Sequence, residues 1–374
     1  MNAKTSWATV AAVLAGGVLA WSAEGGGASS PAPRPLVQLA ILLDTSGSME
    51  GMIKQAQTQL WAIVNEFATA ARDGQKPILQ VGLYRYGTPA LGADNGYVRQ
   101  LLPLTDDLDR VSEELFRLTT DGGDEYCGWV IRDAVDGLAW SRNPQDYRAV
   151  FIAGNEPFDQ GRVPFREACK AAVTKGIIVN TVHCAGAEDR FWAAAASLAD
   201  GQFMRIDGSR AVVEVKAPQD AELARLNEAL NATYVAYGRA GAENKARQAA
   251  VDAGAVAAGS LPGRAIAKAG SQYRNARWDM VDAVAEKEVR LEELRDEDLP
   301  ENMRKMTLDE RKGFLAAREQ ERQAIQARIR DLAEARQEFV AAETKRNANQ
   351  GTLGEGIRST VRAQAAKSGF RFAE

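Results

Sequence analysis

Three oxygen-bearing side chains follow the first apolar run of the chain at alternate positions. Asp44, Ser46 and Ser48 come directly after residues 36–43, whose sequence LVQLAILL is short and almost wholly apolar. Such a run is typical of a strand buried on both faces of a parallel sheet. Open α/β sheets bind ligands at the carboxyl ends of their strands. One carboxylate and two hydroxyls there suit a divalent cation, Mg²⁺ first and Mn²⁺ or Ca²⁺ as alternatives. Without a metal, Ser48 would simply cap the next helix.

The pattern Asp-x-Ser-x-Ser at residues 44–48 resembles the metal-ion-dependent adhesion site of von Willebrand factor type A domains. The resemblance covers roughly half of the chain, and we assign residues 36–210 to this domain. Members of the family have a doubly wound, mostly parallel sheet. Their cation leaves one coordination position open for an acidic group of a partner. The resemblance therefore implies a cation-dependent protein-binding module.

The resemblance places further ligands in the loop TTDGGDEYCG at residues 119–128. Asp124 follows the paired glycines, where some family members carry an aspartate ligand. A different registration of the loop puts Glu125 at that position, and Thr120 is a third alternative. Without a metal, these carboxylates would favour the positive end of the following helix.

A second loop, GNEP at residues 154–157, follows another apolar run. Asn155 falls where the family usually has an aspartate, and Glu156 is its neighbour. An amide oxygen is a neutral ligand, weaker than a carboxylate for a hard cation. The implied ligands are Asp44, Ser46, Ser48, Asp124 and Asn155, with Thr120, Glu125 and Glu156 as alternative ligands or outer acceptors.

Strand and helix patterns alternate through residues 36–208. We expect strands at residues 36–43, 77–86, 97–104, 147–153, 177–184 and 202–206. We expect helices at residues 53–72, 108–118, 129–140, 165–174 and 191–199. Strands separated by helices predict a six-stranded, mostly parallel sheet with helices on both faces, a Rossmann-like α/β fold.

Residues 211–346 predict an all-α extension, either a helical hairpin or a bundle. Residues 306–345 form its longest helical pattern, which Thr307 and Glu310 begin as a capping box. The apolar stripe of this helix predicts packing within the extension, or a coiled-coil arm that docks a partner or a second copy. Residues 273–282 also read as helical and predict an interdomain contact or a binding patch. By analogy with the family, the helix at residues 221–237 would close the type A domain and couple its site to the extension.

Residues 347–374 are expected to form a tail that is helical in part, at residues 353–367. At the other end, residues 1–23 resemble an export signal, with Lys4 before an apolar segment. Residues 24–35 are rich in Gly, Ala, Ser and Pro and predict a flexible linker. These features predict a bacterial periplasmic or secreted protein with no membrane span once the signal is cleaved, or an anchored one if it is retained.

Export implies an oxidising compartment, where disulfides persist. Cys127 and Cys184 both map to the ligand end of the expected sheet, so a Cys127–Cys184 disulfide is a hypothesis. The remaining Cys169 falls in an amphipathic helix and predicts a buried thiol.

Charge and motif content narrow the function. The net charge of −4 leaves no basic footprint for nucleic acid. The chain has one histidine, His183, and neither a phosphate-binding loop nor a Gly-x-Ser-x-Gly elbow. We therefore expect no enzyme, but a binding module whose partner is an envelope protein with an exposed carboxylate. The alternatives are a scaffold that binds through its helical extension and a hydrolase with an unrecognised site. Some residues near the ligand end could frame the partner surface or pack in the core: Tyr126, Trp129, Phe158 and His183.

Overall fold

The computed structural model describes residues 34–184, 190–205, 215–346 and 353–372. The expected signal peptide at 1–23 lies outside these residues, as do nearly all of the linker at 24–35 and the expected boundary near residue 210. Within the described residues, no helix combines the length and the apolar character needed to cross a membrane.

Six strands form one sheet in the order β4-β3-β1-β5-β6-β7. Strand β4 is antiparallel to β3, and the other neighbours are parallel. The α/β fold class predicted from the sequence is therefore confirmed. From β1 the chain first builds one half of the sheet and later the other, which makes the carboxyl end of β1 the switch point where such sheets bind ligands. The strands are β1 (Leu36–Asp44), β3 (Ile78–Tyr86), β4 (Val98–Thr105), β5 (Tyr147–Gly154), β6 (Ile178–His183) and β7 (Phe203–Arg205).

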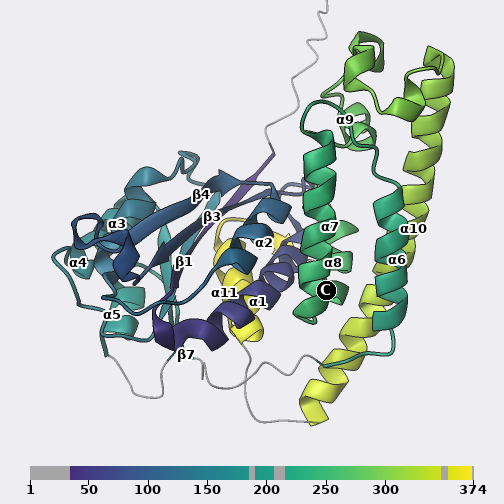
Figure 1. Cartoon of the computed structure of the whole chain (residues 1–374). Coiled ribbons are helices and arrows are strands. Elements are labelled where there is room, and N and C mark those ends of the chain that lie inside the picture. Colours follow the sequence, from purple (N-terminus) through teal and green to yellow (C-terminus); the bar gives the residue numbers. More distant parts are fainter. Residues whose placement is uncertain (1–33, 185–189, 206–214, 347–352, 373–374) are drawn as a thin grey trace, which may run out of the picture. The chain divides into compact units, whose positions relative to one another are not determined.

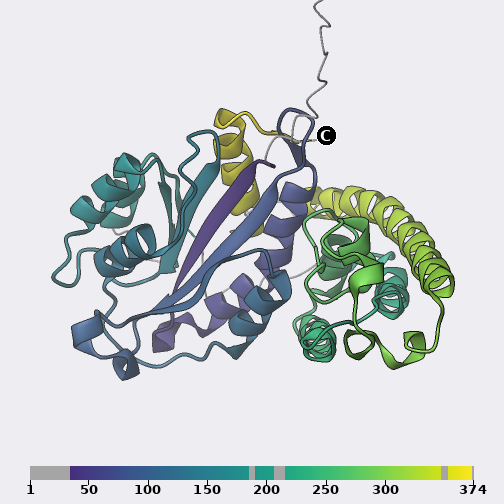
Figure 2. The same ribbon diagram turned by 90° about the horizontal axis from the view of Figure 1, so that it is seen from above.

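Helices cover both faces of this sheet (Figure 2). One face packs against α1 (Glu50–Ala68) and α2 (Leu108–Arg117). The other packs against α3 (Cys127–Gly137), α4 (Phe165–Thr174) and α5 (Arg190–Leu198). Strand β1 serves both cores because its side chains alternate: Leu39 and Leu43 face the first set of helices, and Ala40 and Leu42 face the second.

The end of the chain returns to the sheet. Helix α11 (Leu353–Lys367) lies beside α1, although the two are far apart in the sequence (Figure 1). Its buried Val361 and the following Phe370 belong to the same core as α1. Strand β8 (Arg371–Phe372) pairs with β2 (Ala70–Ala71). Because β2 follows α1 directly, α1 ends at Ala68, before the expected residue 72. Residues 353–372 are therefore a part of the sheet domain and not a tail.

The helical region is consequently an insertion, residues 215–346, between β7 and α11. Its helices are α6 (Asp220–Ala232), α7 (Gly241–Ala257), α8 (Leu261–Lys268), α9 (Met280–Ala285) and α10 (Leu308–Arg346). Helix α6, expected to close the sheet domain, instead packs with α8 and α10 inside the insertion. Helix α11 closes the sheet domain, so the expected role of residues 221–237 was wrong.

The long helix α10 packs on the insertion itself. Thr307 and Glu310 form the predicted capping box: the Thr307 amide donates to the Glu310 carboxylate, and the Glu310 amide donates back to the Thr307 hydroxyl. From the apolar stripe, Leu315 and Ile329 are buried in the two cores of the insertion. Packing within the extension is thus the arrangement observed. Self-association through residues 306–345 stays a prediction.

Residues 273–279 are not helical, contrary to expectation. Asp279 is extended and caps α9 by accepting a hydrogen bond from the Asp282 amide. A cap of this kind stops a helix from continuing through it. The segment does make the predicted interdomain contact, because Arg277 pairs with Asp106 just before α2. The stretch from 286 to 307 also departs from the all-helical expectation, with three short 3₁₀ turns: Leu291–Glu293, Asp296–Asp298 and Glu301–Met303.

Cys127, Cys169 and Cys184 are buried free thiols, so the hypothesised Cys127–Cys184 disulfide is not formed. The buried hydroxyl of Tyr86 stands close to both, 3.8 Å from the Cys127 sulfur. Burial raises the pKa of Tyr86, and the neighbouring Cys127 and Cys184 add to that shift. Burial of Cys169 was predicted and is confirmed; it raises the pKa of this thiol to about 12.

Candidate cation site

The site begins at Asp44, the last residue of β1, whose side chain is completely buried. Its Oδ1 accepts a hydrogen bond of 2.7 Å from the Ser46 amide. Its Oδ2 is buried and has no hydrogen-bond partner among the described residues. An oxygen without a partner in such a place costs about 1–3 kcal/mol. The fold therefore keeps one carboxylate oxygen ready for a group that the chain itself does not supply.

Ser46, Ser48 and Asn155 join Asp44 through a short chain of contacts. The hydroxyls of Ser46 and Ser48 lie 3.1 Å apart. The Asn155 amide donates to the Ser48 hydroxyl at 2.8 Å, and its Oδ1 is a second buried oxygen without a partner in the described residues. Four of the five predicted ligands are thus brought together from the ends of β1 and β5.

The fifth predicted ligand, Asp124, lies elsewhere. Its side chain is exposed. The pKa of Tyr97 is raised, first by desolvation and then by the charge of Asp124 and a hydrogen bond with it, so Asp124 faces Tyr97. Glu125 is buried instead. A Cβ atom placed on Gly87 would lie 2.6 Å from Oδ1 of Asp44 and 3.0 Å from Cγ of Glu125, so both carboxylates border the same glycine. The geometry therefore favours the alternative registration, with Glu125 beside Asp44.

Backbone contacts hold the loops in register. The Asp121 amide donates to the Thr45 carbonyl at 2.9 Å, which brings Thr120 and its neighbours alongside residues 44–48. The Thr45 hydroxyl donates to the Tyr86 carbonyl at 3.0 Å and lies 2.8 Å from the Thr88 hydroxyl. The Tyr86 hydroxyl donates across the sheet to the Ala153 carbonyl at 2.9 Å. These buried polar contacts were not predicted, because they join residues that only the folded sheet brings together.

Like charges crowd this end of the sheet. Burial raises the pKa of Asp44 to about 6, and Glu156 adds to the shift against hydrogen bonds from Ser46. Burial also raises the pKa of Glu125 to about 8, with further contributions from the carboxylates of Asp44, Glu156 and Asp124. Each carboxylate therefore makes its neighbour harder to ionise, and a bound cation would reverse that effect.

The donor set fits a hard cation. Among the described residues, no three His, Cys, Asp or Glu side chains gather closely enough to hold a metal by themselves. Two carboxylates must therefore be supplemented by hydroxyl and amide oxygens, as Ser46, Ser48 and Asn155 allow. Oxygen donors without sulfur or imidazole are the set that Mg²⁺, Mn²⁺ and Ca²⁺ prefer. Two of these oxygens, Oδ2 of Asp44 and Oδ1 of Asn155, are the ones that lack a hydrogen-bond partner in the described residues and that a cation would satisfy.

The four residues expected near the rim divide into two pairs. Phe158 and His183 are buried in the core around Trp192. Tyr126 and Trp129 are half-buried, and Tyr126 packs edge-on against Tyr97 at 5.2 Å between ring centroids. Only the second pair can therefore take part in a surface beside the cation loops.

Comparison with known proteins yields structural likeness without sequence relatives. No family model matches the chain, and no curated protein matches it. The VWA domain of SpRpn10 is similar to 46% of this chain and 88% of its own, with 15% identity and a TM-score of 0.36. An aerotolerance-related membrane protein from Bacteroides fragilis matches over 46% of this chain and 92% of its own, with 18% identity and a TM-score of 0.32.

A third similar structure is proximal thread matrix protein 1 from the mussel byssus, with a zinc-occupied MIDAS motif. The match covers 47% of this chain and 43% of that protein, with 11% identity and a TM-score of 0.38. Likeness at these values carries no conclusion about ligands or partners. The strand order and the Asp-x-Ser-x-Ser loop at the end of the central strand establish the fold.

Proposed function

We propose that this chain, which has the fold of a von Willebrand factor type A domain, is a divalent-cation-dependent protein-binding module. One observation supports this above all: the buried Asp44 Oδ2 has no partner in the described residues, beside the oxygens of Ser46, Ser48 and Asn155. A cation would give that oxygen a partner. A carboxylate of another protein would then complete the coordination of the cation.

Five residues would hold the cation. Asp44, Ser46, Ser48 and Asn155 follow the predicted set, and Glu125 takes the place of Asp124 because it is the buried neighbour of Asp44. The carboxylates of Asp44 and Glu125 then balance the charge of one divalent ion, and the other three ligands are neutral. Glu156 and Thr120 would act as outer partners that hydrogen-bond to coordinated water. We propose Mg²⁺ as the resident ion.

Capture of partners from an envelope extract tests this function. The full chain is immobilised and challenged in Mg²⁺, in EDTA, and as the isosteric variant Asp44→Asn. We expect a partner that is retained in Mg²⁺ and lost in both other arms. A matched control is Asp94→Asn, an exposed carboxylate on the loop before β4, which should leave capture unchanged. Capture that is the same in all arms would contradict cation-dependent binding.

Binding through the insertion is the second candidate. Helix α10 extends over 39 residues and carries mostly exposed, charged side chains beyond its buried stripe. A scaffold that binds through this surface would retain its partner in EDTA and in Asp44→Asn. A catalytic role is not part of the proposal; turnover of peptide, ester or glycan substrates that is lost in Asp44→Asn would contradict that view.

We further propose that the protein is exported and acts in the bacterial periplasm or outside the cell. The support is the sequence alone: residues 1–23 resemble an export signal and residues 24–35 predict a flexible linker. Of these, the structure describes residues 34 and 35. Cell fractionation with amino-terminal sequencing of the mature protein tests this. A start near residue 24 in the periplasmic fraction is expected, and an uncleaved cytoplasmic chain would contradict it.

A further inference from the structure

One arginine of the insertion contacts both helices that lead to the cation loops. Arg264 on α8 is completely buried. Its Nη1 donates to Oδ1 of Asp109 on α2 at 2.7 Å. Its guanidinium also lies 4.8 Å from the ring of Trp61 on α1. A planar guanidinium can bond through its edge and stack through its face, so a single side chain joins α1 and α2.

The insertion fixes this arginine from behind. Arg264 pairs with Asp252 of α7, which also binds Lys268 at 3.1 Å. Asn227 and Asn231 of α6 donate to the other oxygen of Asp252 at 2.8 and 2.6 Å. Removing one member of a buried charge network leaves the remaining charges unpaired, which is strongly destabilising. The contact with α1 and α2 is therefore set by three helices of the insertion.

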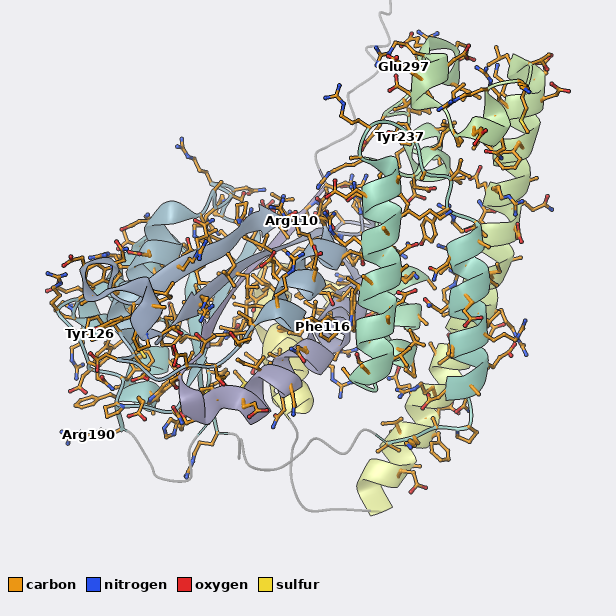
Figure 3. All side chains as sticks on the ribbon, in the orientation of Figure 1. Arg110, Phe116, Tyr126, Arg190, Tyr237 and Glu297 are labelled. Atoms are coloured by element: carbon orange, nitrogen blue, oxygen red, sulfur yellow. The ribbon has the colours of Figure 1, made fainter. Side chains whose placement is uncertain are left out.

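Further contacts follow α2 along its length. Tyr273 donates to the second carboxylate oxygen of Asp109 at 2.6 Å, and Arg247 donates to Glu113 at 2.9 Å. Phe116 points from α2 toward α7 (Figure 3), where its ring lies against Gly254. On α1, the Asn65 amide donates to the Gly263 carbonyl at 3.0 Å. The acidic face of α2 thus meets a basic face of the insertion.

Both helices lead directly into the cation loops. Helix α1 begins two residues after Ser48, and α2 is followed by the loop that carries Glu125. The two helices also contact each other, since the Gln57 amide donates to the Leu115 carbonyl at 3.0 Å. The two loops are joined by the bond between the Asp121 amide and the Thr45 carbonyl. Any change in the spacing of α1 and α2 therefore reaches both loops.

We propose that the insertion orders the cation loops: α8, through Arg264, holds α1 and α2 at the spacing that brings Glu125 beside Asp44. Arg264 is a positioning residue, since it contacts neither loop itself. By thermodynamic linkage, a cation in the site strengthens the docking of α8, and docking strengthens cation binding by the same factor. The statement about cations rests on the proposed function; the ordering of the loops does not.

Hydrogen exchange of the full chain tests the ordering in EDTA, where no cation takes part. The variants are Arg264→Met and, in case that chain fails to fold, the milder pair Tyr273→Phe and Arg247→Ala. The control is Arg225→Ala, which removes an exposed ion pair inside α6. We expect the variants to exchange several-fold faster at residues 44–56 and 118–126, with β5 unchanged. Faster exchange at residues 261–268 without any change in those two segments would overturn the proposal.

The same variants in Mg²⁺ separate this proposal from the function. We expect Mg²⁺ to slow exchange at residues 261–268 of the wild-type chain, and the variants to bind Mg²⁺ several-fold more weakly. If Mg²⁺ has no effect on the wild-type chain while the EDTA result holds, the cation function fails and the ordering of the loops stands. If Mg²⁺ protects the loops but exchange at residues 261–268 stays the same, the linkage is refuted and the cation site stands.

Discussion

Gly87 lies against Asp44 so closely that a Cβ atom at position 87 would fall 2.6 Å from the Asp44 carboxylate. The backbone of Gly87 also has φ of +80°, a conformation that residues with a side chain rarely adopt. Position 87 borders the site, and only glycine fits there without a clash with Asp44 or backbone strain. Substitution there should affect cation binding as well as stability.

We predict that Gly87→Ala lowers both the stability of the chain and its affinity for Mg²⁺. The left-handed backbone alone costs alanine about 1–2 kcal/mol. Displacement of Asp44 should weaken cation binding by about tenfold or more, equivalent to about 1.4 kcal/mol. Calorimetric titration and thermal unfolding measure the two effects separately.

Gly74→Ala is the matched control, since Gly74 has φ of +74° and open space where its Cβ would lie. It should lose stability to a similar degree and keep its Mg²⁺ affinity. Equal affinities in the two variants would show that Gly87 does not shape the site.

Glu125→Gln and Asp124→Asn distinguish the two registrations of the loop. Burial beside Asp44 disfavours the ionised form of Glu125 in the folded chain, and glutamine does not carry this cost, so Glu125→Gln should raise the melting temperature in EDTA at neutral pH. It should also weaken Mg²⁺ binding by about tenfold, or about 1.4 kcal/mol. Asp124→Asn should change neither value appreciably, because Asp124 is exposed and faces Tyr97. The reverse pattern would restore Asp124 as the ligand.

Stability without a cation should fall as the pH rises from about 4 to about 8. In the folded chain the pKa values of Asp44 and Glu125 are about 6 and about 8, both above their usual range. Between the ordinary and the raised values the folded state holds more protons than the unfolded state, so each rise in pH favours unfolding. Mg²⁺ should therefore stabilise the protein little at pH 5 and strongly at pH 8.

Melting temperatures across this pH range, in EDTA and in Mg²⁺, measure the effect. The double variant Asp44→Asn with Glu125→Gln is the control and should flatten this part of the EDTA profile. A wild-type EDTA profile that rises between pH 4 and 8 would contradict the assignment of these carboxylates.

Gln364 of α11 makes a buried junction with the sheet. It accepts a hydrogen bond from the Tyr147 hydroxyl at 2.7 Å and exchanges amide hydrogen bonds with Asn180. Gln364→Ala leaves both partners buried and should cost about 1–3 kcal/mol of unfolding free energy. The exposed neighbour Lys367→Ala should cost nothing measurable in chemical denaturation. Equal stabilities would show that α11 is not an integral part of the sheet domain.

Local pattern was enough to predict most of the sheet domain. The apolar run before Asp44 and the polar residues that follow it at every second position identify a strand end with a ligand loop. Because strand ends fall at one edge of a parallel sheet, Asn155 could be placed near Asp44 as well. Local sequence pattern also predicted the helix at residues 353–367 and the capping box of Thr307 and Glu310.

Long-range packing determined what the pattern could not predict. The choice between Asp124 and Glu125 depends on the path of the loop past Gly87, the residue that follows β3. The return of α11 depends on Val361 and Phe370 meeting α1 across the whole insertion. Asp279 read as one more helical residue, but in the fold its carboxylate accepts from the Asp282 amide at the start of α9 and also binds Arg322 of α10 at 2.6 Å.

Calorimetric titration of Mg²⁺ into the full chain, compared with Asp44→Asn, tests the central claim most directly. Saturating Mg²⁺ at about 100 times its dissociation constant should stabilise the wild-type chain by about 2.7 kcal/mol. The account predicts binding of a single cation by the wild-type chain. It predicts no binding by Asp44→Asn, whose melting temperature in EDTA is at least that of the wild type because a buried charge is gone. Equal binding by the two chains, or no binding by the wild type, would contradict the account.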